Sequence, residues 1–253
     1  ASWVPRFFDE QEVKEKTTLW HYLRDERWVY RWDKEEDIDQ FAVWVAEGQK
    51  PEPNMVLFFD FHAVNDHFTP GFAWTTWKKL PDWEEKITTS FIKVFPHYKD
   101  ARVSIRPAEN KENWTGYISF PGKSPLEIDQ FGDGARHAFK ILAALIALSE
   151  TVDDEHQGIF LWEDPELFMH PATLGRLLEE VINILDDKPI QVFISTQSLE
   201  VLAWMASSLE DKSSLLANFN TYSLKLQTSG ILDSRLFRGK EVNEWLVDGF
   251  DPR

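Results

Sequence analysis

The stretch that most constrains the fold of this chain covers residues 158–171 and reads GIFLWEDPELFMHP. Its apolar run, residues 159–162, is typical of a short strand that is buried on both faces. Glu163 and Asp164 follow at once, and Pro165 then ends the strand because proline cannot donate to a sheet ladder. Paired carboxylates at the end of a buried strand are a common way for an α/β protein to hold a metal-bound phosphate. A strand followed by a solvated acidic turn is the alternative.

Two flanking stretches complete a pattern. Upstream, residues 130–137 (QFGDGARH) open a long apolar helix that is predicted over 135–149. Downstream, the apolar run 190–194 is closed by the hydroxyl-rich residues 195–198, which read STQS. The order along the chain is therefore a glycine-bearing helix start, an acidic strand end and a hydroxyl-rich strand end.

In this order the three stretches resemble the C-terminal half of an ABC-type ATPase head, in the group of SMC, Rad50 and OLD-like (AAA15/AAA21) ATPases. Gly132-Asp133-Gly134 resembles the signature motif, residues 161–171 resemble Walker B running into the D-loop, and STQS resembles the switch-histidine loop. The resemblance covers roughly residues 101–253. It implies an α/β head over 99–253, with a mainly parallel sheet flanked by helices, that binds ATP and Mg²⁺.

The glycine-bearing helix start would face a phosphate. By the resemblance, backbone N–H groups at Gly132 and Gly134 approach the γ-phosphate held by an opposing head, and the helix dipole assists them. Asp133 adds a negative charge there, which Arg136 and His137 are expected to offset. An ordinary turn from a loop into a helix is the alternative.

The two carboxylates would divide the chemistry between them. By the resemblance, Glu163 helps to hold Mg²⁺ and Asp164 polarises the attacking water. The family order is Asp then Glu, so the base here is one methylene shorter than usual. Because a misplacement of about 1 Å can cost about 100-fold in rate, we expect slow hydrolysis. Glu166, the next carboxylate, is expected on a solvated face, with a surrogate base as the alternative.

His170 and Gln197 complete the candidate site. His170 stands where this group has its D-loop histidine, and an interface role is expected for it. Gln197 stands at the switch position, where the family normally has histidine. Glutamine can bond to a phosphate oxygen or a water but cannot carry a positive charge. Both departures predict a head that turns ATP over slowly or only senses it.

No stretch of the sequence supplies a Walker A motif. Gly122-Lys123-Ser124 invites that interpretation, but five residues separate Gly116 from Gly122 where the motif has four. Pro125 also follows where a helix should begin, so we predict a turn. The phosphate-gripping loop is therefore expected from an upstream segment or from a partner, or the chain is a degenerate member without nucleotide binding.

The composition of the chain limits the classes of partner it can bind and the cellular compartment in which it is expected. The net charge of −16 repels phosphate backbones, so nucleic acid is expected only through a partner. The absence of cysteine excludes disulfides and thiolate metal sites and fits a reducing cytoplasm. No apolar run approaches the roughly 18–20 residues of a membrane span. We expect a cytoplasmic protein, acting as a homodimer or with a partner that carries Walker A or an effector.

Residues 1–98 are Trp-rich and predicted to be mostly helical, with helices over 10–15, 19–23 and 37–47. The resemblance implies that they form the lid or arm insertion of this ATPase group. Further helices are predicted over 83–95, 171–185 and 199–209, and strands over 54–61, 103–106, 114–120, 219–226 and 231–237.

The leading functional hypothesis is an ATP-dependent conformational switch that works with a separate effector, and the resemblance implies a role in DNA repair or anti-phage defence. One alternative is an inactive ATPase-like scaffold that binds a partner protein through the Trp-rich N-terminal region. A weaker one is a metal nuclease that uses Asp60, His62 and His67, with Asp66 nearby.

Overall fold

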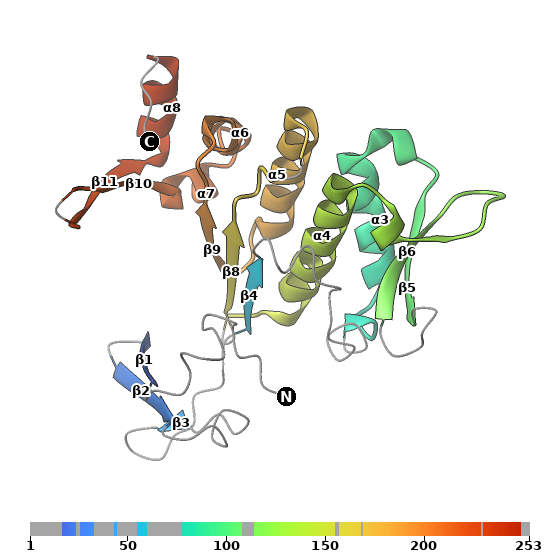
Figure 1. Cartoon of the computed structure of the whole chain (residues 1–253), viewed down its shortest axis with the longest axis horizontal. Helices are drawn as coiled ribbons and strands as arrows, with labels where there is room; N and C mark the ends of the chain where they lie inside the picture. Colours follow the sequence, from blue (N-terminus) through green and yellow to red (C-terminus); the bar gives the residue numbers. More distant parts are fainter. Residues whose placement is uncertain are drawn as a thin grey trace. The chain divides into compact units, whose positions relative to one another are not determined.

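The chain divides into two compact units, Ala1–Asn54 and Met55–Arg253. The computed structural model describes residues 55–59, 77–107, 114–154, 157–167, 169–228 and 230–248, and of the first unit the strands alone (Figure 1). The predicted division between a lid at 1–98 and a head at 99–253 falls inside the second unit and stays a prediction.

The described part of the first unit is a small antiparallel sheet. Its strands are β1 (Thr17–Leu23), β2 (Glu26–Trp32) and β3 (Val43–Trp44), in the order β1-β2-β3. The helix predicted over 19–23 is therefore wrong, and so is the part of the 37–47 helix that falls on β3. The physical reason is the run of threonine, aromatic and β-branched residues, which favours a strand. The remaining predicted helices of this unit lie outside the described residues.

A parallel sheet forms the centre of the second unit. Its strands are β4 (Met55–Phe59), β8 (Gly158–Glu163) and β9 (Ile190–Ser195), in the order β4-β8-β9. All three run parallel, and Trp162 pairs with both Phe59 and Ile194. Strand β8 lies in the middle and pairs along both edges. Gly158, Phe160 and Trp162 are buried on one face, whereas Ile159 and Leu161 on the other face are half-buried, so the predicted burial on both faces holds for one face alone.

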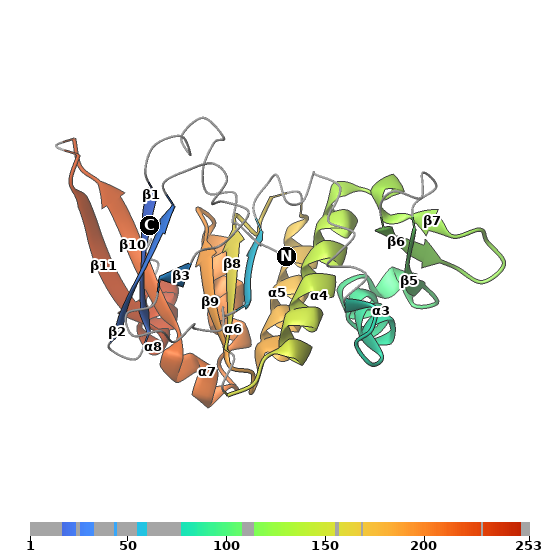
Figure 2. The same ribbon diagram turned by 90° about the horizontal axis from the view of Figure 1, so that it is seen from below.

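Four helices accompany this sheet: α3 (Trp83–Val94), α4 (Asp133–Thr151), α5 (Pro171–Leu185) and α6 (Leu199–Ser208). The contacts place α4 against β4, α5 and α3, and α5 against α6 (Figures 1 and 2). The α/β class, with a parallel sheet flanked by helices, is thus confirmed. Within the described ranges, no helix is both long and apolar enough to cross a bilayer.

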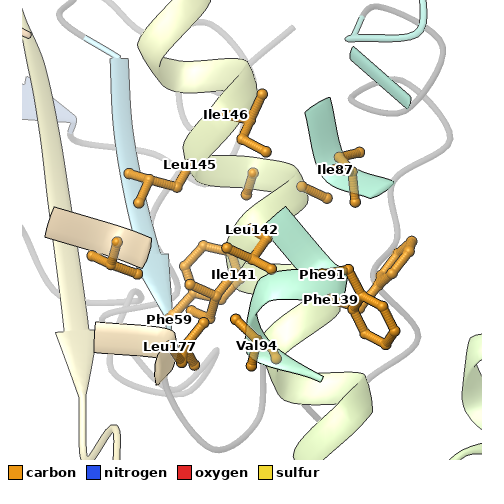
Figure 3. Close-up of a cluster of buried hydrophobic side chains, with 14 of the residues drawn as sticks. Phe59, Ile87, Phe91, Val94, Phe139, Ile141, Leu142, Leu145, Ile146 and Leu177 are labelled. Carbon is orange, nitrogen blue, oxygen red and sulfur yellow. The ribbon is translucent and has the colours of Figure 1, made fainter. Parts of the chain in front are cut away.

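Helix α4 is the centre of the hydrophobic core. Every residue from Ala138 to Ser149 is buried, because the helix is covered on all sides. Figure 3 shows its side chains between Phe59 of β4, Leu177 of α5 and the residues Ile87, Phe91 and Val94 of α3. A helix that is apolar all round is expected to be buried in this way.

A second, antiparallel sheet follows α3 and the 3₁₀ turn Pro96–Tyr98. It contains β5 (Arg102–Pro107), β6 (Trp114–Ser119) and β7 (Leu126–Glu127), in that order, and the 3₁₀ turn Ile128–Gln130 leads from it to α4. Gly122 has a φ of 71°, in the left-handed region that favours glycine. The Gly122-Lys123-Ser124 stretch is therefore a turn before β7, which confirms that it is not a P-loop.

The C-terminal part contains α7 (Ser213–Asn218), β10 (Asn220–Leu226), β11 (Leu232–Arg238) and α8 (Gly239–Val247). Strands β10 and β11 form the predicted antiparallel hairpin. The sequence analysis did not predict α7 and α8. The apolar residues Val242, Trp245 and Leu246 of α8 do stand at helical spacing, but both helices are short, with six and nine residues.

Candidate functional site

Strand pairing brings the acidic strand end beside the hydroxyl-rich strand end. Glu163, the last residue of β8, pairs with Ser195, the last residue of β9. The backbone N–H of Asp164 donates to the carbonyl of Ser195 over 2.9 Å. Because the carboxyl ends of parallel strands meet at one edge of the sheet, Glu163, Asp164 and the 196–198 loop come together there.

Asp164 begins a tight turn after β8. Its φ of 45° lies in the left-handed region, which aspartate tolerates better than most residues. Its carbonyl accepts a bond from the N–H of Leu167 over 2.9 Å. Burial and the nearby carboxylate of Glu166 raise the pKa of Asp164 above its ordinary value. Glu163 by contrast is exposed at the sheet edge.

The sequence suggested a solvated face for Glu166, and the structure shows that this expectation is wrong. Glu166 is half-buried, and both of its carboxylate oxygens accept from Thr196 Oγ1, over 2.9 and 2.8 Å. One of them also accepts from the backbone N–H of Gln197 over 3.1 Å. The turn after β8 is therefore bonded directly to the loop after β9. Sequence reasoning missed this link, because only the strand register brings the two loops together.

The loop that carries Gln197 is shaped by its own hydroxyl groups. The N–H of Ser198 donates to Thr196 Oγ1 over 2.9 Å, and Ser198 Oγ accepts from the N–H of Glu200 as the N-cap of α6. Gln197 lies between these two hydroxyl groups, and its side chain is exposed. The loop therefore presents Gln197 at the sheet edge near Asp164.

His170 caps helix α5. Its Nδ1 accepts from the N–H of Ala172 over 3.3 Å, with Pro171 at the first helical position. The side chain is exposed. This capping role was not predicted from the sequence, and the interface role expected for His170 stays a prediction.

The glycine-bearing start of α4 is exposed. Gly132 is the N-cap, and its carbonyl accepts from the N–H groups of Ala135 and Arg136 over 2.9 and 3.2 Å. A Cβ at Gly132 would meet no atom within 4 Å, so packing does not require glycine there. Arg136 Nη2 lies 2.6 Å from Asp133 Oδ1, and this ion pair offsets the aspartate charge as expected.

His137 does not offset that charge. It is 2% exposed, and its Nε2 accepts from the indole N–H of Trp162 over 3.2 Å. Burial and the charge of Lys140 lower the pKa of His137 to about 4, so the ring is neutral at neutral pH. A histidine within an apolar helix is the one sequence signal that could have indicated this buried contact.

The same contact orients α4 against β8. His137 meets Trp162 at the end of β8, whereas Leu148 Cδ1 would lie 3.0 Å from a Cβ at Gly158, at its start. Helix α4 therefore runs antiparallel to β8. Its N-terminus, about 8 Å along the axis beyond His137, lies at the carboxyl end of the sheet. Gly132, Asp133 and Gly134 are thus at the same end as Glu163 and Asp164.

The donor set at this edge suits a hard cation. Mg²⁺ usually keeps several waters and takes one or two carboxylates together with substrate phosphates, and Glu163 and Asp164 fit that demand. Within the described ranges, no three histidine, cysteine, aspartate or glutamate residues gather as they would in an all-protein metal cage. The candidate nuclease residues Asp60, His62, Asp66 and His67 lie outside the described residues.

Comparison with known proteins identifies a family. The family model with the description "AAA domain, putative AbiEii toxin, Type IV TA system" matches residues 73–203, just over half of the chain. No curated protein sequence matches the chain.

Several solved structures of SMC heads are distantly similar. One is an SMC head bound to the C-winged helix domain of ScpA, with 11% identity, a TM-score of 0.49, and coverage of 87% of this chain and 67% of that chain. Another comes from work on ATP-driven dimerization and DNA-stimulated activation of SMC ATPases, with 10% identity, a TM-score of 0.47, and coverage of 70% and 94%. A third is the Smc head of Pyrococcus furiosus bound to the C-terminal domain of ScpA, with 11% identity and a TM-score of 0.43. The match covers 66% of this chain and 37% of that one.

Proposed function

Because the chain belongs to the family of AAA domains described as putative AbiEii toxin, Type IV TA system, we propose that it binds ATP with Mg²⁺ and acts as a nucleotide-dependent conformational switch. One observation carries the proposal: the pairing of β8 with β9 brings Glu163, Asp164 and the Gln197 loop to the carboxyl end of a parallel sheet. Open parallel sheets bind their ligands at that end.

Each carboxylate has a distinct role in this proposal. Glu163, exposed at the strand end, would bind Mg²⁺ directly or through water. The bound ion would neutralise charge on the β- and γ-phosphate oxygens. Asp164 would accept a proton from the attacking water, and its raised pKa makes it a better proton acceptor than an ordinary aspartate.

Gln197 would orient the γ-phosphate or the water rather than stabilise charge. Its side chain donates and accepts hydrogen bonds but carries no charge. With the shorter base at Asp164, this predicts slow turnover, so the protein would spend most of its cycle in the ATP-bound state. A long-lived bound state suits a switch better than a motor.

The start of α4 would serve a second nucleotide-bearing surface. A long helix with an exposed, glycine-bearing N-terminus directs backbone N–H groups and the positive end of its dipole toward an anion. We propose that Gly132 and Gly134 meet the γ-phosphate held by a second copy, or by a partner that carries a Walker A loop, with His170 at the same interface. Closure around ATP would then signal to an effector, in anti-phage defence, a toxin–antitoxin pair or DNA repair.

The test is ATP binding and turnover with Mg²⁺, by the chain alone and again with its native upstream segment or partner added. We expect binding with slow turnover. Glu163→Gln should weaken Mg²⁺ binding, so that a higher Mg²⁺ concentration is needed for the same turnover. Asp164→Asn should lower kcat by about 100-fold while ATP still binds. Failure to bind ATP in either setting would overturn the proposal and leave the partner-binding scaffold.

A further inference from the structure

We infer that Glu166 is a positioning residue that joins the turn after β8 to the loop after β9, so that Asp164 and Gln197 move as one unit. This inference deepens the proposed function and rests on it for its catalytic meaning. The joint itself, meaning the hydrogen bonds of Glu166 to Thr196 and Gln197, is present in the protein without nucleotide.

The geometry of the Glu166 carboxylate carries the inference. Thr196 Oγ1 lies 2.9 and 2.8 Å from its two oxygens, and Gln197 N lies 3.1 Å from one of them. Hydrogen bonds to an ionised acceptor are among the stronger ones in proteins. Both oxygens already accept hydrogen bonds from the protein, which favours a positioning role for Glu166 over a role as a surrogate base.

The hydroxyl of Thr196 is held so that it must donate to Glu166. The N–H of Ser198 donates to Thr196 Oγ1 over 2.9 Å and occupies one of its lone pairs. The hydroxyl proton is then directed toward the carboxylate. Carboxylate, hydroxyl and amide therefore form a connected chain, and such chains strengthen cooperatively.

Gln197 lies beyond the end of the sheet, and its backbone is bonded there to Glu166. The last ladder pair is Glu163 with Ser195, and the one further backbone bond described between the two loops is from Asp164 N–H to Ser195. Residue 197 lies beyond both. Its own N–H is held by Glu166, two residues after Asp164. Removal of the carboxylate would take away this hydrogen bond at the residue that is proposed to meet the γ-phosphate.

The experiment first measures amide hydrogen exchange of residues 196–198 without nucleotide. We expect Glu166→Ala and Thr196→Val each to speed exchange at Gln197 roughly tenfold, since each removes a hydrogen bond to a charged group. The double variant should exchange no faster than Glu166→Ala alone, because both changes break one joint. The control is Glu179→Ala, an exposed carboxylate on α5, which should change nothing.

The second measurement separates positioning from simple folding. With ATP and Mg²⁺, Glu166→Ala should lower kcat about tenfold with little change in KM, and Glu166→Gln, which keeps an acceptor oxygen, should recover part of it. The Glu166→Gln and Thr196→Val variants keep the test valid if Glu166→Ala does not fold.

Each outcome decides a separate point. Unchanged exchange in both single variants, or additive effects in the double variant, would overturn the joint. Faster exchange with unchanged kcat would overturn its positioning role. If the unaltered protein binds no ATP, the proposed function fails, while the exchange result still decides whether the two loops are joined.

Discussion

Among the polar residues buried in the core, His137 lies beside the candidate site and Glu180 lies between helices, and the contacts of each predict a measurable effect. His137 is buried against Trp162, and burial together with Lys140 lowers its pKa from 6.5 to about 4. Between these values the unfolded chain binds more protons than the folded one. The contribution of His137 to stability is therefore complete above pH 6.5 and is lost as the pH falls toward 4.

This predicts a free energy of unfolding that falls by up to about 3 kcal/mol on acidification through that window. His137→Gln should flatten the dependence, because glutamine accepts from the Trp162 N–H but does not titrate. Urea denaturation between pH 6.5 and pH 4 measures the free energy of unfolding of the unaltered protein and of the His137→Gln variant. An equal slope of unfolding free energy against pH in the two proteins would contradict the assignment of this effect to His137.

Asp164 contributes to the pH dependence with the opposite sign, because its raised pKa favours the protonated folded state as the pH falls.

Glu180 is the second buried residue. It is 4% exposed, accepts from Ser90 Oγ over 2.7 Å, and binds Lys93 Nζ with both oxygens at 3.0 Å. It thereby joins α5 to α3. Glu180→Ala should cost about 2 kcal/mol of stability, because Ser90 loses its acceptor in the core while Lys93 can turn to water. Thermal unfolding measures the change. The control is Glu179→Ala at the exposed neighbouring residue, which should change the free energy of unfolding by no more than about 0.5 kcal/mol.

At the scale of elements, two glycines set how closely neighbouring elements approach. A Cβ at Gly116 of β6 would lie 2.2 Å from Phe139 Cζ on α4, and one at Gly175 of α5 would lie 2.6 Å from Trp204 Cε2 on α6. Both distances are too short for real contacts. The difference between them is the freedom of the partner ring, since Phe139 is fully buried and Trp204 is 42% exposed.

We therefore expect Gly116→Ala to destabilise by about 1–3 kcal/mol, because the buried ring must shift within a packed core. Gly175→Ala should cost less, within about 1 kcal/mol, since Trp204 can turn outward and alanine favours the helix. Chemical denaturation of the two variants side by side tests this order. A greater loss at Gly175 would show that α5 and α6 are locked more tightly than the exposure of Trp204 implies.

At the scale of the whole molecule, the β10–β11 hairpin presents an apolar face to solvent. Tyr222 pairs with Leu236 and Leu226 with Leu232 across the two strands, and all four are between 41% and 70% exposed. Because side chains alternate along a strand, Phe237 points to the other face, where it is buried against Trp245. Contiguous exposed apolar side chains bind dyes and promote association.

Replacing Leu226 and Leu232 together by serine should leave stability within about 0.5 kcal/mol of the unaltered protein. It should also lower the fluorescence of a bound hydrophobic dye and reduce light scattering at high protein concentration. Phe237→Ala is the contrasting change and should destabilise by about 3 kcal/mol. Unchanged dye binding in the double variant would show that another surface binds the dye.

Much of the second unit could be predicted from the sequence alone, because its patterns are local. The apolar run before Glu163 and Asp164 predicted a buried strand, the period of residues 171–185 predicted α5, and the β5–β6 and β10–β11 hairpins followed from alternation and turn residues. The α/β class followed from the order of these elements. The position of Glu163 and Asp164 at the end of β8 could be predicted because the strand and the carboxylates after it are consecutive in the sequence, whereas their chemical roles stay a prediction.

Only the tertiary structure decided which side chains meet across the chain. The sequence could not show that Glu166 bonds to Thr196 and Gln197, since that contact depends on the register of β8 against β9. Nor could it show that His137 is neutral, because its pKa depends on burial by distant residues. At residues 17–23 the threonine and aromatic residues favour the strand that is observed in place of the helix predicted over 19–23, and only the tertiary structure showed that it pairs with residues 26–32. Propensity and periodicity act over a few residues, whereas partners and protonation states depend on long-range packing.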